Sequence, residues 1–151
     1  MFAHYESSIF NDSGGVDMRS TGFPDGAFNL VISNHVLEHV DDDLKALREG
    51  LRIVGNRGIV HVCVPSPIYK WQTDDWGFAD PAKNYHFRTY GADFPMWAQR
   101  SINGALCCAA VGRDPVTGSY DFVYFLSRSA ESLRGLAAHF QRNAVPVSRY
   151  W

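Results

Sequence analysis

The chain has 151 residues, of which 46% are hydrophobic and 14% aromatic, enough apolar material for one compact domain over residues 1–151. The net charge of −2, with no basic cluster, excludes nucleic acid as an expected partner. No apolar run approaches the ~20 residues that cross a bilayer, and no basic-then-apolar leader opens the chain. We therefore expect a cytoplasmic protein with no membrane partner.

A turn followed by a short apolar run lies between residues 23 and 40, which read FPDGAFNLVISNHVLEHV. The Pro-Asp-Gly sequence at 24–26 supplies turn chemistry, because proline fixes φ and glycine permits a positive φ. The apolar run at 30–32 fits a strand buried on both faces, as in a parallel sheet covered by helices. Open α/β sheets place ligands at the carboxyl ends of such strands. The residues expected there are Ser33, Asn34 and His35.

A helix is expected directly after this strand. Three aspartates at 41–43 offer N-cap oxygens and a favourable first-turn charge. The apolar stripe of this helix consists of Leu44, Leu47, Leu51 and Val54. Gly-Asn-Arg-Gly at 55–58 ends the helix, and residues 59–64 are expected to form the next buried strand. Strand, helix and strand in this order predict a right-handed crossover.

The second half of the chain is predicted to complete the same layer. Residues 65–82 lack periodicity and are expected to form a long loop. The remaining predicted elements are a short helix at 92–99, an antiparallel hairpin of strands 105–111 and 120–126 with its turn at 114–118, and a helix at 129–142 before a polar and aromatic tail. The cysteines, Cys63, Cys107 and Cys108, have the spacing of neither a disulfide framework nor a zinc knuckle, so we expect small core residues.

Several short motifs follow one another between Val16 and Pro65. They are Asp17, FPDGAF, NLVIS, HVLEHV, LKALREGLRIV, GNRG and IVHVCVP. In order and spacing this segment resembles the middle of a class I S-adenosylmethionine-dependent methyltransferase of the methyltransferase type 11 kind. The segment YHFRTYGADF at residues 85–94 is similar to one found in some small-molecule methyltransferases. The resemblance implies an α/β fold with a partial Rossmann-like sheet, in which parallel strands are followed by a carboxyl-terminal antiparallel hairpin and flanked by helices.

The resemblance also implies a cofactor, S-adenosylmethionine, and roles for individual residues. Asp17 aligns with the family's acidic residue that accepts a hydrogen bond from the adenine amino group, although an aspartate before a turn is also an ordinary cap. The other implied cofactor-binding residues are Met18, Ser33, Asn34 and His35. His39 could act as the catalytic general base, since an ordinary histidine pKa of about 6.5 suits proton transfer, or it could orient the helix start. The residues expected to contact a polar methyl acceptor, or to form an amphipathic strand or turn, are His86, Arg88 and Tyr90.

The family's glycine-rich cofactor loop, which follows a first strand, is not visible in this sequence. Gly14 and Gly15 have no strand before them and are expected to form a bend. The resemblance therefore covers the carboxyl-terminal portion of the fold. We expect a truncated, small-molecule methyltransferase-like protein with an incomplete cofactor site and weak or no activity alone. The alternative is a non-catalytic remnant or subunit that acts through protein–protein pairing.

The strand at 29–33 would then expose one edge of backbone donors and acceptors beside apolar side chains. Such edges recruit other strands, and each buried group without a partner costs about 1–3 kcal/mol. We expect the edge to be covered by residues 2–10 or by the same strand of a second chain. This predicts a homodimer, or a complex with a complementing chain.

His35, Glu38 and His39 also fit the H-x-x-E-H pattern of inverted zinc peptidases. Zinc in that class needs both histidines on one turn of a helix. The predicted strand before the pentapeptide and the helix start after it place the pattern at a strand-to-helix junction. We therefore expect no metal site, and a zinc hydrolase is kept as an alternative.

Overall fold

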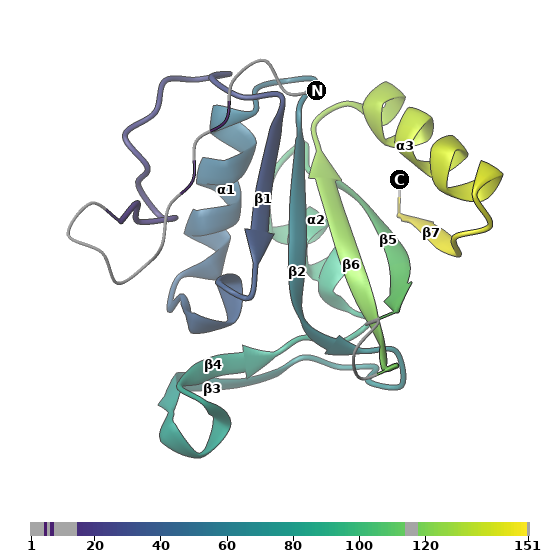
Figure 1. The fold of residues 1–151 in the computed structure, drawn as a ribbon. Helices are drawn as coiled ribbons and strands as arrows, with labels where there is room; N and C mark the ends of the chain where they lie inside the picture. Colours follow the sequence, from purple (N-terminus) through teal and green to yellow (C-terminus); the bar gives the residue numbers. More distant parts are fainter. Residues whose placement is uncertain (1–4, 6, 8–14, 114–117, 151) are drawn as a thin grey trace.

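A computed structural model of the chain describes residues 5, 7, 15–113 and 118–150. In these residues a five-stranded sheet has the order β1-β2-β6-β5-β7, and β3 pairs with β4 in a separate hairpin (Figure 1). The strands are β1 Leu30–Asn34, β2 Ile59–Pro67, β3 Asp74–Asp80, β4 His86–Thr89, β5 Leu106–Arg113, β6 Tyr120–Ser127 and β7 Val147–Tyr150. The helices are α1 Asp43–Ile53, α2 Phe94–Ser101 and α3 Ala130–Arg142, with short 3-10 helices η1 Leu37–His39 and η2 Pro81–Lys83.

The predicted strand, helix and strand are confirmed as β1, α1 and β2. β1 and β2 are parallel, and their pairing ends where Asn34 lies opposite Cys63. Asp42 caps α1, because its side chain accepts a hydrogen bond of 2.9 Å from the backbone N–H of Lys45. Gly55 follows the helix with a φ of 66°, the left-handed backbone conformation that ends many helices.

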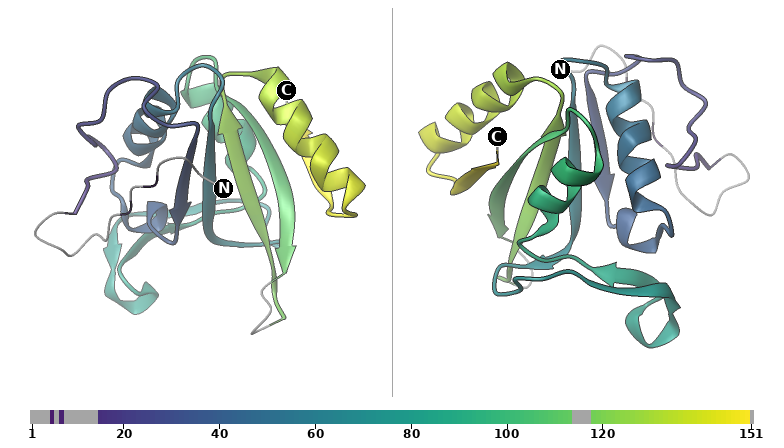
Figure 2. Two further views of the ribbon diagram at one scale, coloured as in Figure 1. Left: turned by 45° about the horizontal axis from the view of Figure 1, so that its top comes forward. Right: turned by 180° about the vertical axis from the view of Figure 1, so that it is seen from behind.

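Different helices cover the two faces of the sheet (Figure 2). α1 and α2 pack on one face, over a core whose largest buried side chains are Tyr90, Tyr124, Phe94, Leu37, Leu47 and Leu51. α3 packs on the other face beside β5 and β6, where the ring of Phe140 lies 5.2 Å from that of Phe125. Because α3 covers only that end of the sheet, the outer faces of β1 and β2 are left partly open.

β1 is buried less completely than its apolar run predicts. Ser33 is buried on the α1 side, whereas Ile32 is 55% exposed. The prediction that this strand is buried on both faces is wrong for the described part of the chain, because β1 is an edge strand there and no described helix covers its second face. Residues 2–10, one of the two expected covers of this edge, lie outside the described residues except for Tyr5 and Ser7.

The long loop predicted at 65–82 is wrong in part. β2 continues to Pro67, and β3 pairs with β4 in an antiparallel hairpin beyond the carboxyl ends of β1 and β2 (Figure 1). The sequence of β3, DDWGFAD, gave no apolar alternation because most of its side chains face solvent. Gly91 returns the chain toward the core close to Gln72. A Cβ at Gly91 would lie 2.6 Å from the carbonyl carbon of Gln72, so only glycine fits there.

The predicted hairpin of residues 105–111 and 120–126 is confirmed as β5 and β6, which are antiparallel. Most of its turn, at 114–117, lies outside the described residues. β6 also pairs antiparallel with β2, and β7, expected only as a tail, pairs with β5. The observed fold is therefore mixed α/β, with one parallel pair in a mostly antiparallel sheet. The expected partial Rossmann-like sheet fits it coarsely.

The three cysteines were expected to be small core residues. Cys107 and Cys108 are buried, as expected, whereas Cys63 is half-buried, and burial raises the pKa of all three thiols. Within the described ranges, none of the helices combines the length and the hydropathy that a bilayer crossing requires.

Candidate functional site

The carboxyl end of β1 is shaped by an abrupt change of chain direction. The backbone N–H of His35 donates a hydrogen bond of 2.8 Å to the carbonyl oxygen of Cys63, and His35 has a φ of 50°. Residues other than glycine seldom adopt this left-handed conformation. The chain then leaves the sheet and enters η1. Ser33 is buried at this point, while Asn34 and His35 are exposed.

Two of the predicted cofactor-binding residues lie in contact. The hydroxyl of Ser33 donates a hydrogen bond of 3.6 Å to the sulfur of Met18, which packs against the core. This contact brings the segment before β1 to the carboxyl end of that strand. The cofactor role of the two residues stays a prediction, and their proximity is consistent with it.

The segment that carries Met18 is fastened to α1 by Glu49. The backbone N–H and the hydroxyl of Thr21 donate to Oε1 of Glu49 at 2.9 and 2.6 Å. Arg52 donates to both carboxylate oxygens of Glu49 and to the carbonyl of Phe23 at 2.6 Å. These hydrogen bonds, those from Arg52 first, lower the pKa of Glu49 to about 2. The segment before β1 therefore has a fixed position beside the helix.

Asp17 is exposed and pairs with a neighbour in sequence. Arg19 donates to its carboxylate from Nη2 at 2.9 Å and to Oδ1 of Asp41 at 2.6 Å. The hydrogen bonds from Arg19 lower the pKa of Asp17. The pair ties the turn at Asp17 to the residues before α1. An adenine contact by Asp17 stays a prediction.

Four titratable side chains gather between η1 and β4. Nδ1 of His35 lies 3.2 Å from Oε1 of Glu38, which is buried, and the rings of His39 and His86 meet edge to face with centroids 4.6 Å apart. His39, the predicted general base, is exposed. Burial, followed by the charge of His39, lowers the pKa of His86, which favours its neutral form. The structure thus brings the predicted base together with one of the predicted acceptor contacts.

Arg88 and Tyr90 lie in a buried network instead of an open cleft. The guanidinium of Arg88 donates to the carbonyls of Val40 and Asp41 at 2.8 and 2.9 Å, and lies 3.0 Å from the carboxylate of Asp43. The hydroxyl of Tyr90 donates to the same carboxylate at 2.8 Å. Burial raises the pKa of Asp43, although both of these partners favour its charged form. These contacts hold β4 against the start of α1, and a role in acceptor binding stays a prediction.

The buried role of Asp43 was not found by reasoning from the sequence. The three aspartates at 41–43 were expected to supply the N-cap and a favourable first-turn charge. Asp42 is the cap and Asp43 lies in the first turn, but its side chain is buried and bonded to Tyr90 and Arg88. The available signal was the alternation of His86, Arg88 and Tyr90, which places three polar side chains on one face of an extended segment. A face of that kind needs acidic partners elsewhere in the chain.

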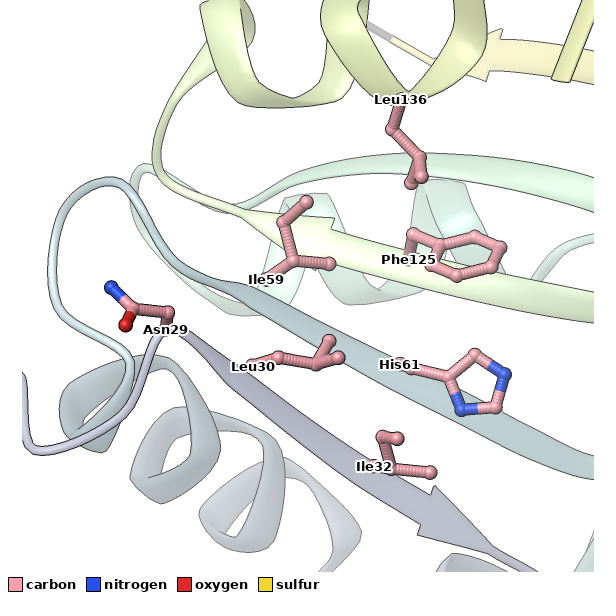
Figure 3. Close-up of a pocket in the computed structure, with 7 residues that line it drawn as sticks. All are labelled: Asn29, Leu30, Ile32, Ile59, His61, Phe125 and Leu136. Atoms are coloured by element: carbon pink, nitrogen blue, oxygen red, sulfur yellow. The ribbon is translucent and has the colours of Figure 1, made fainter. Parts of the chain in front are cut away.

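An apolar groove lies on the open face of the sheet, away from these residues (Figure 3). It has a volume of about 310 Å³ and is lined by Asn29, Leu30, Ile32, Ile59, His61, Phe125 and Leu136. Nδ1 of His61 is buried in it with no hydrogen-bond partner among the described residues. Burial lowers the pKa of His61. The groove is a surface for apolar contact and offers little polar chemistry.

The part of the chain that contains β1 and its carboxyl end is similar to known proteins. A family model described as a methyltransferase domain matches residues 11–62. The chain is also 28% identical over 92 residues to ajmaline N-methyltransferase from Rauvolfia serpentina, a match that covers 61% of this chain and 30% of that protein. The matched part thus spans under a third of the relative's length. Residues 11–62 are thus similar to a methyltransferase domain, and the mixed α/β sheet agrees coarsely with the fold of the class I S-adenosylmethionine-dependent methyltransferase family.

Proposed function

We propose that this chain is a methyltransferase-like protein that uses S-adenosylmethionine and a small-molecule methyl acceptor. The observation that carries the proposal is the family match over residues 11–62, a segment that contains the contact between Met18 and Ser33 at the end of β1. The relative's name denotes an N-methyltransferase, which favours a nucleophilic nitrogen as the acceptor atom. A cytoplasmic location is part of the same proposal.

The chemistry of methyl transfer makes few demands on protein side chains. The nucleophile displaces the sulfonium sulfur, and catalysis rests mostly on proximity and alignment. The imidazole of His39 is exposed, and its ring nitrogen can take the proton that the nucleophile loses. Among the predicted acceptor contacts we favour His86, because the donors of Arg88 and the hydroxyl of Tyr90 are already bonded to protein groups.

We also propose that the chain binds S-adenosylmethionine weakly by itself. In the described residues β1 is the first strand, and no strand with a glycine-rich loop comes before it. The methionine carboxylate and the ribose then find few fixed donors. A complementing chain that carries such a loop would restore the site.

Isothermal titration calorimetry with S-adenosylmethionine and with its demethylated product tests the cofactor proposals. We expect a Kd weaker than about 100 μM, which corresponds to less than about 5.5 kcal/mol of binding free energy. A Ser33→Ala variant should weaken this binding further, whereas Ser148→Ala, on the exposed strand β7, should leave it unchanged. A low-micromolar Kd would refute the weak-binding proposal. Equal Kd values for Ser33→Ala and the unaltered chain would refute the role of Ser33.

A second candidate function is pairing with another copy of this chain, and it is favoured by the surface of β1. β1 has β2 as its only partner among the described strands, and its exposed Ile32 borders the apolar groove. An edge strand beside an apolar face can pair with its own copy across a two-fold axis. Such pairing would cover both the backbone edge and Ile32.

Light scattering coupled to size exclusion tests the second candidate. We expect a dimer for the unaltered chain and a monomer for Ile32→Lys, because a lysine would place a charge in the paired edge. Tyr69→Lys is the matched control, since Tyr69 is 81% exposed and does not line the groove. A monomeric unaltered chain at micromolar concentration would rule out this pairing.

A further inference from the structure

Glu38, His39 and His86 offer metal-binding atoms to one point in space. Glu38 and His39 belong to η1 and His86 to β4, and one donor atom from each residue lies within 4.8 Å of the other two. η1 and β4 are packed against each other beyond the carboxyl end of β1. The three side chains therefore converge from two separate parts of the sequence.

The carboxylate of Glu38 is incompletely satisfied by protein groups. Glu38 is 0% exposed, and its Oε2 has no hydrogen-bond partner among the described residues. Its Oε1 lies 3.2 Å from Nδ1 of His35. A buried carboxylate oxygen without a partner carries a desolvation cost, and in proteins buried charges are normally paired or bound to metals. Oε2 thus has the free lone pairs that a cation would take.

We propose that Glu38, His39 and His86 bind a divalent transition-metal ion, with zinc as the best fit. Two imidazoles and one carboxylate form a three-ligand set typical of zinc sites that keep a fourth position open for water or another ligand. Imidazole favours zinc, copper, iron and nickel over magnesium and calcium, which prefer oxygen ligands alone. His35 would orient the carboxylate from outside the ligand set.

This ligand set differs from that of the H-x-x-E-H pattern. The peptidase pattern would use His35 and His39 on one helical turn, but His39 is the last residue of the short 3-10 helix η1, whereas His35 lies before that helix and has left-handed backbone. The structure instead supplies His86 from β4 as the second imidazole. The inference therefore concerns a metal site and carries no hydrolase activity with it.

The same side chains also have roles in the proposed methyl transfer, where His39 takes a proton and His86 contacts the acceptor. A zinc ion on His39 would occupy the lone pair that a general base needs, so the zinc-bound chain would not use His39 in methyl transfer. The two proposals are tested separately, because zinc can be titrated without S-adenosylmethionine.

Titration of the tag-free full chain with zinc chloride, after removal of metals with a chelator, tests the proposal. We expect one zinc ion per chain, with His86→Ala and Glu38→Gln each weakening the affinity by more than about tenfold, since even outer partners of a metal are worth about 10–100-fold. His139→Ala is the control, because His139 is exposed on α3 and outside the cluster. Circular dichroism of each variant shows whether it is folded.

Cobalt chloride provides a second readout that a general loss of stability would not produce. Cobalt bound by two imidazoles and a carboxylate should give visible absorption bands, which His86→Ala should shift or abolish while Glu38→Gln changes their intensity. Absence of zinc binding would overturn the proposal. So would affinities and cobalt spectra that are equal in the unaltered chain, His86→Ala and Glu38→Gln. Either result leaves the methyltransferase proposal intact.

Discussion

The hydroxyl of Tyr90 donates a hydrogen bond of 2.8 Å to Oδ2 of Asp43, joining the end of β4 to the first turn of α1 inside the core. The same carboxylate oxygen lies 3.0 Å from Nη1 of Arg88. A residue expected to face a ligand therefore lies in a buried polar network.

Tyr90→Phe should lower the free energy of unfolding by about 1–3 kcal/mol, because it removes a donor from a buried carboxylate while keeping the ring. Chemical denaturation measures this change. Tyr69→Phe is the control, since the Tyr69 side chain is 81% exposed and its change should stay within about 0.5 kcal/mol. Equal losses for both variants would contradict the role given to the Tyr90 hydroxyl.

Arg88→Met should cost about 3–5 kcal/mol, because it leaves the buried carboxylate of Asp43 without its cationic partner. It also removes the hydrogen bonds that hold β4 to the carbonyls of Val40 and Asp41. Amide hydrogen exchange should therefore quicken in β3 and β4 more than in β5 and β6. Arg134→Met, on the exposed side of α3, should change neither quantity. Uniform acceleration over all strands would argue against a local anchor.

Glu49→Gln should reduce the dependence of stability on acid pH. The pKa of Glu49 falls from 4.5 to about 2 on folding, so its contribution is complete above pH 4.5 and is lost as the pH falls toward 2. The variant has no carboxylate to protonate there, and its unfolding free energy should fall less steeply over that interval. Denaturation at several pH values measures both slopes. Glu131→Gln, an exposed control on α3, should keep the original slope.

His61→Phe should reduce the loss of stability on mild acidification. Burial lowers the pKa of His61 below 6.5, so the unfolded chain takes up a proton first as the pH falls below 6.5, and the unfolding free energy declines. Phenylalanine removes this proton uptake and the unpartnered Nδ1, and it suits the nearby ring of Phe125. Thermal melts between pH 7.5 and about 5 measure the effect. A variant with an unchanged pH slope would contradict it, and His139→Phe is the exposed control.

The elements that the sequence predicted are those with local signals. α1 has three aspartates at its start, an apolar stripe and Gly55 after it, and β5 and β6 are apolar runs on either side of a turn. β3 and β7 were not predicted from the sequence because they are short or exposed. Each is defined by its pairing with another strand, β3 with β4 and β7 with β5. Tertiary pairing of this kind leaves no periodic pattern.

The candidate site was predicted in part for the same reason. The end of β1 could be located from the apolar run that precedes Ser33. The meeting of His86 with Glu38 and His39 depends on where the β3–β4 hairpin lies, and no local pattern reports that position. Arg88 and Tyr90 illustrate the limit, because a polar face that suits a ligand suits a buried carboxylate equally well.

β6 lies between β2 and β5 in the sheet, although it comes after both in the sequence. Val60 in β2 pairs with Leu126 in β6, so β6 leaves the ribosome long after β2, the strand that it pairs with. Until then a nascent chain can form β1, α1 and β2 but leaves the apolar edge of β2 without its partner. Strand pairings between residues far apart in the sequence slow folding and leave aggregation-prone intermediates with exposed apolar surface. A ribosome stalled before β6 should therefore carry a chain that chaperones bind and proteases cut.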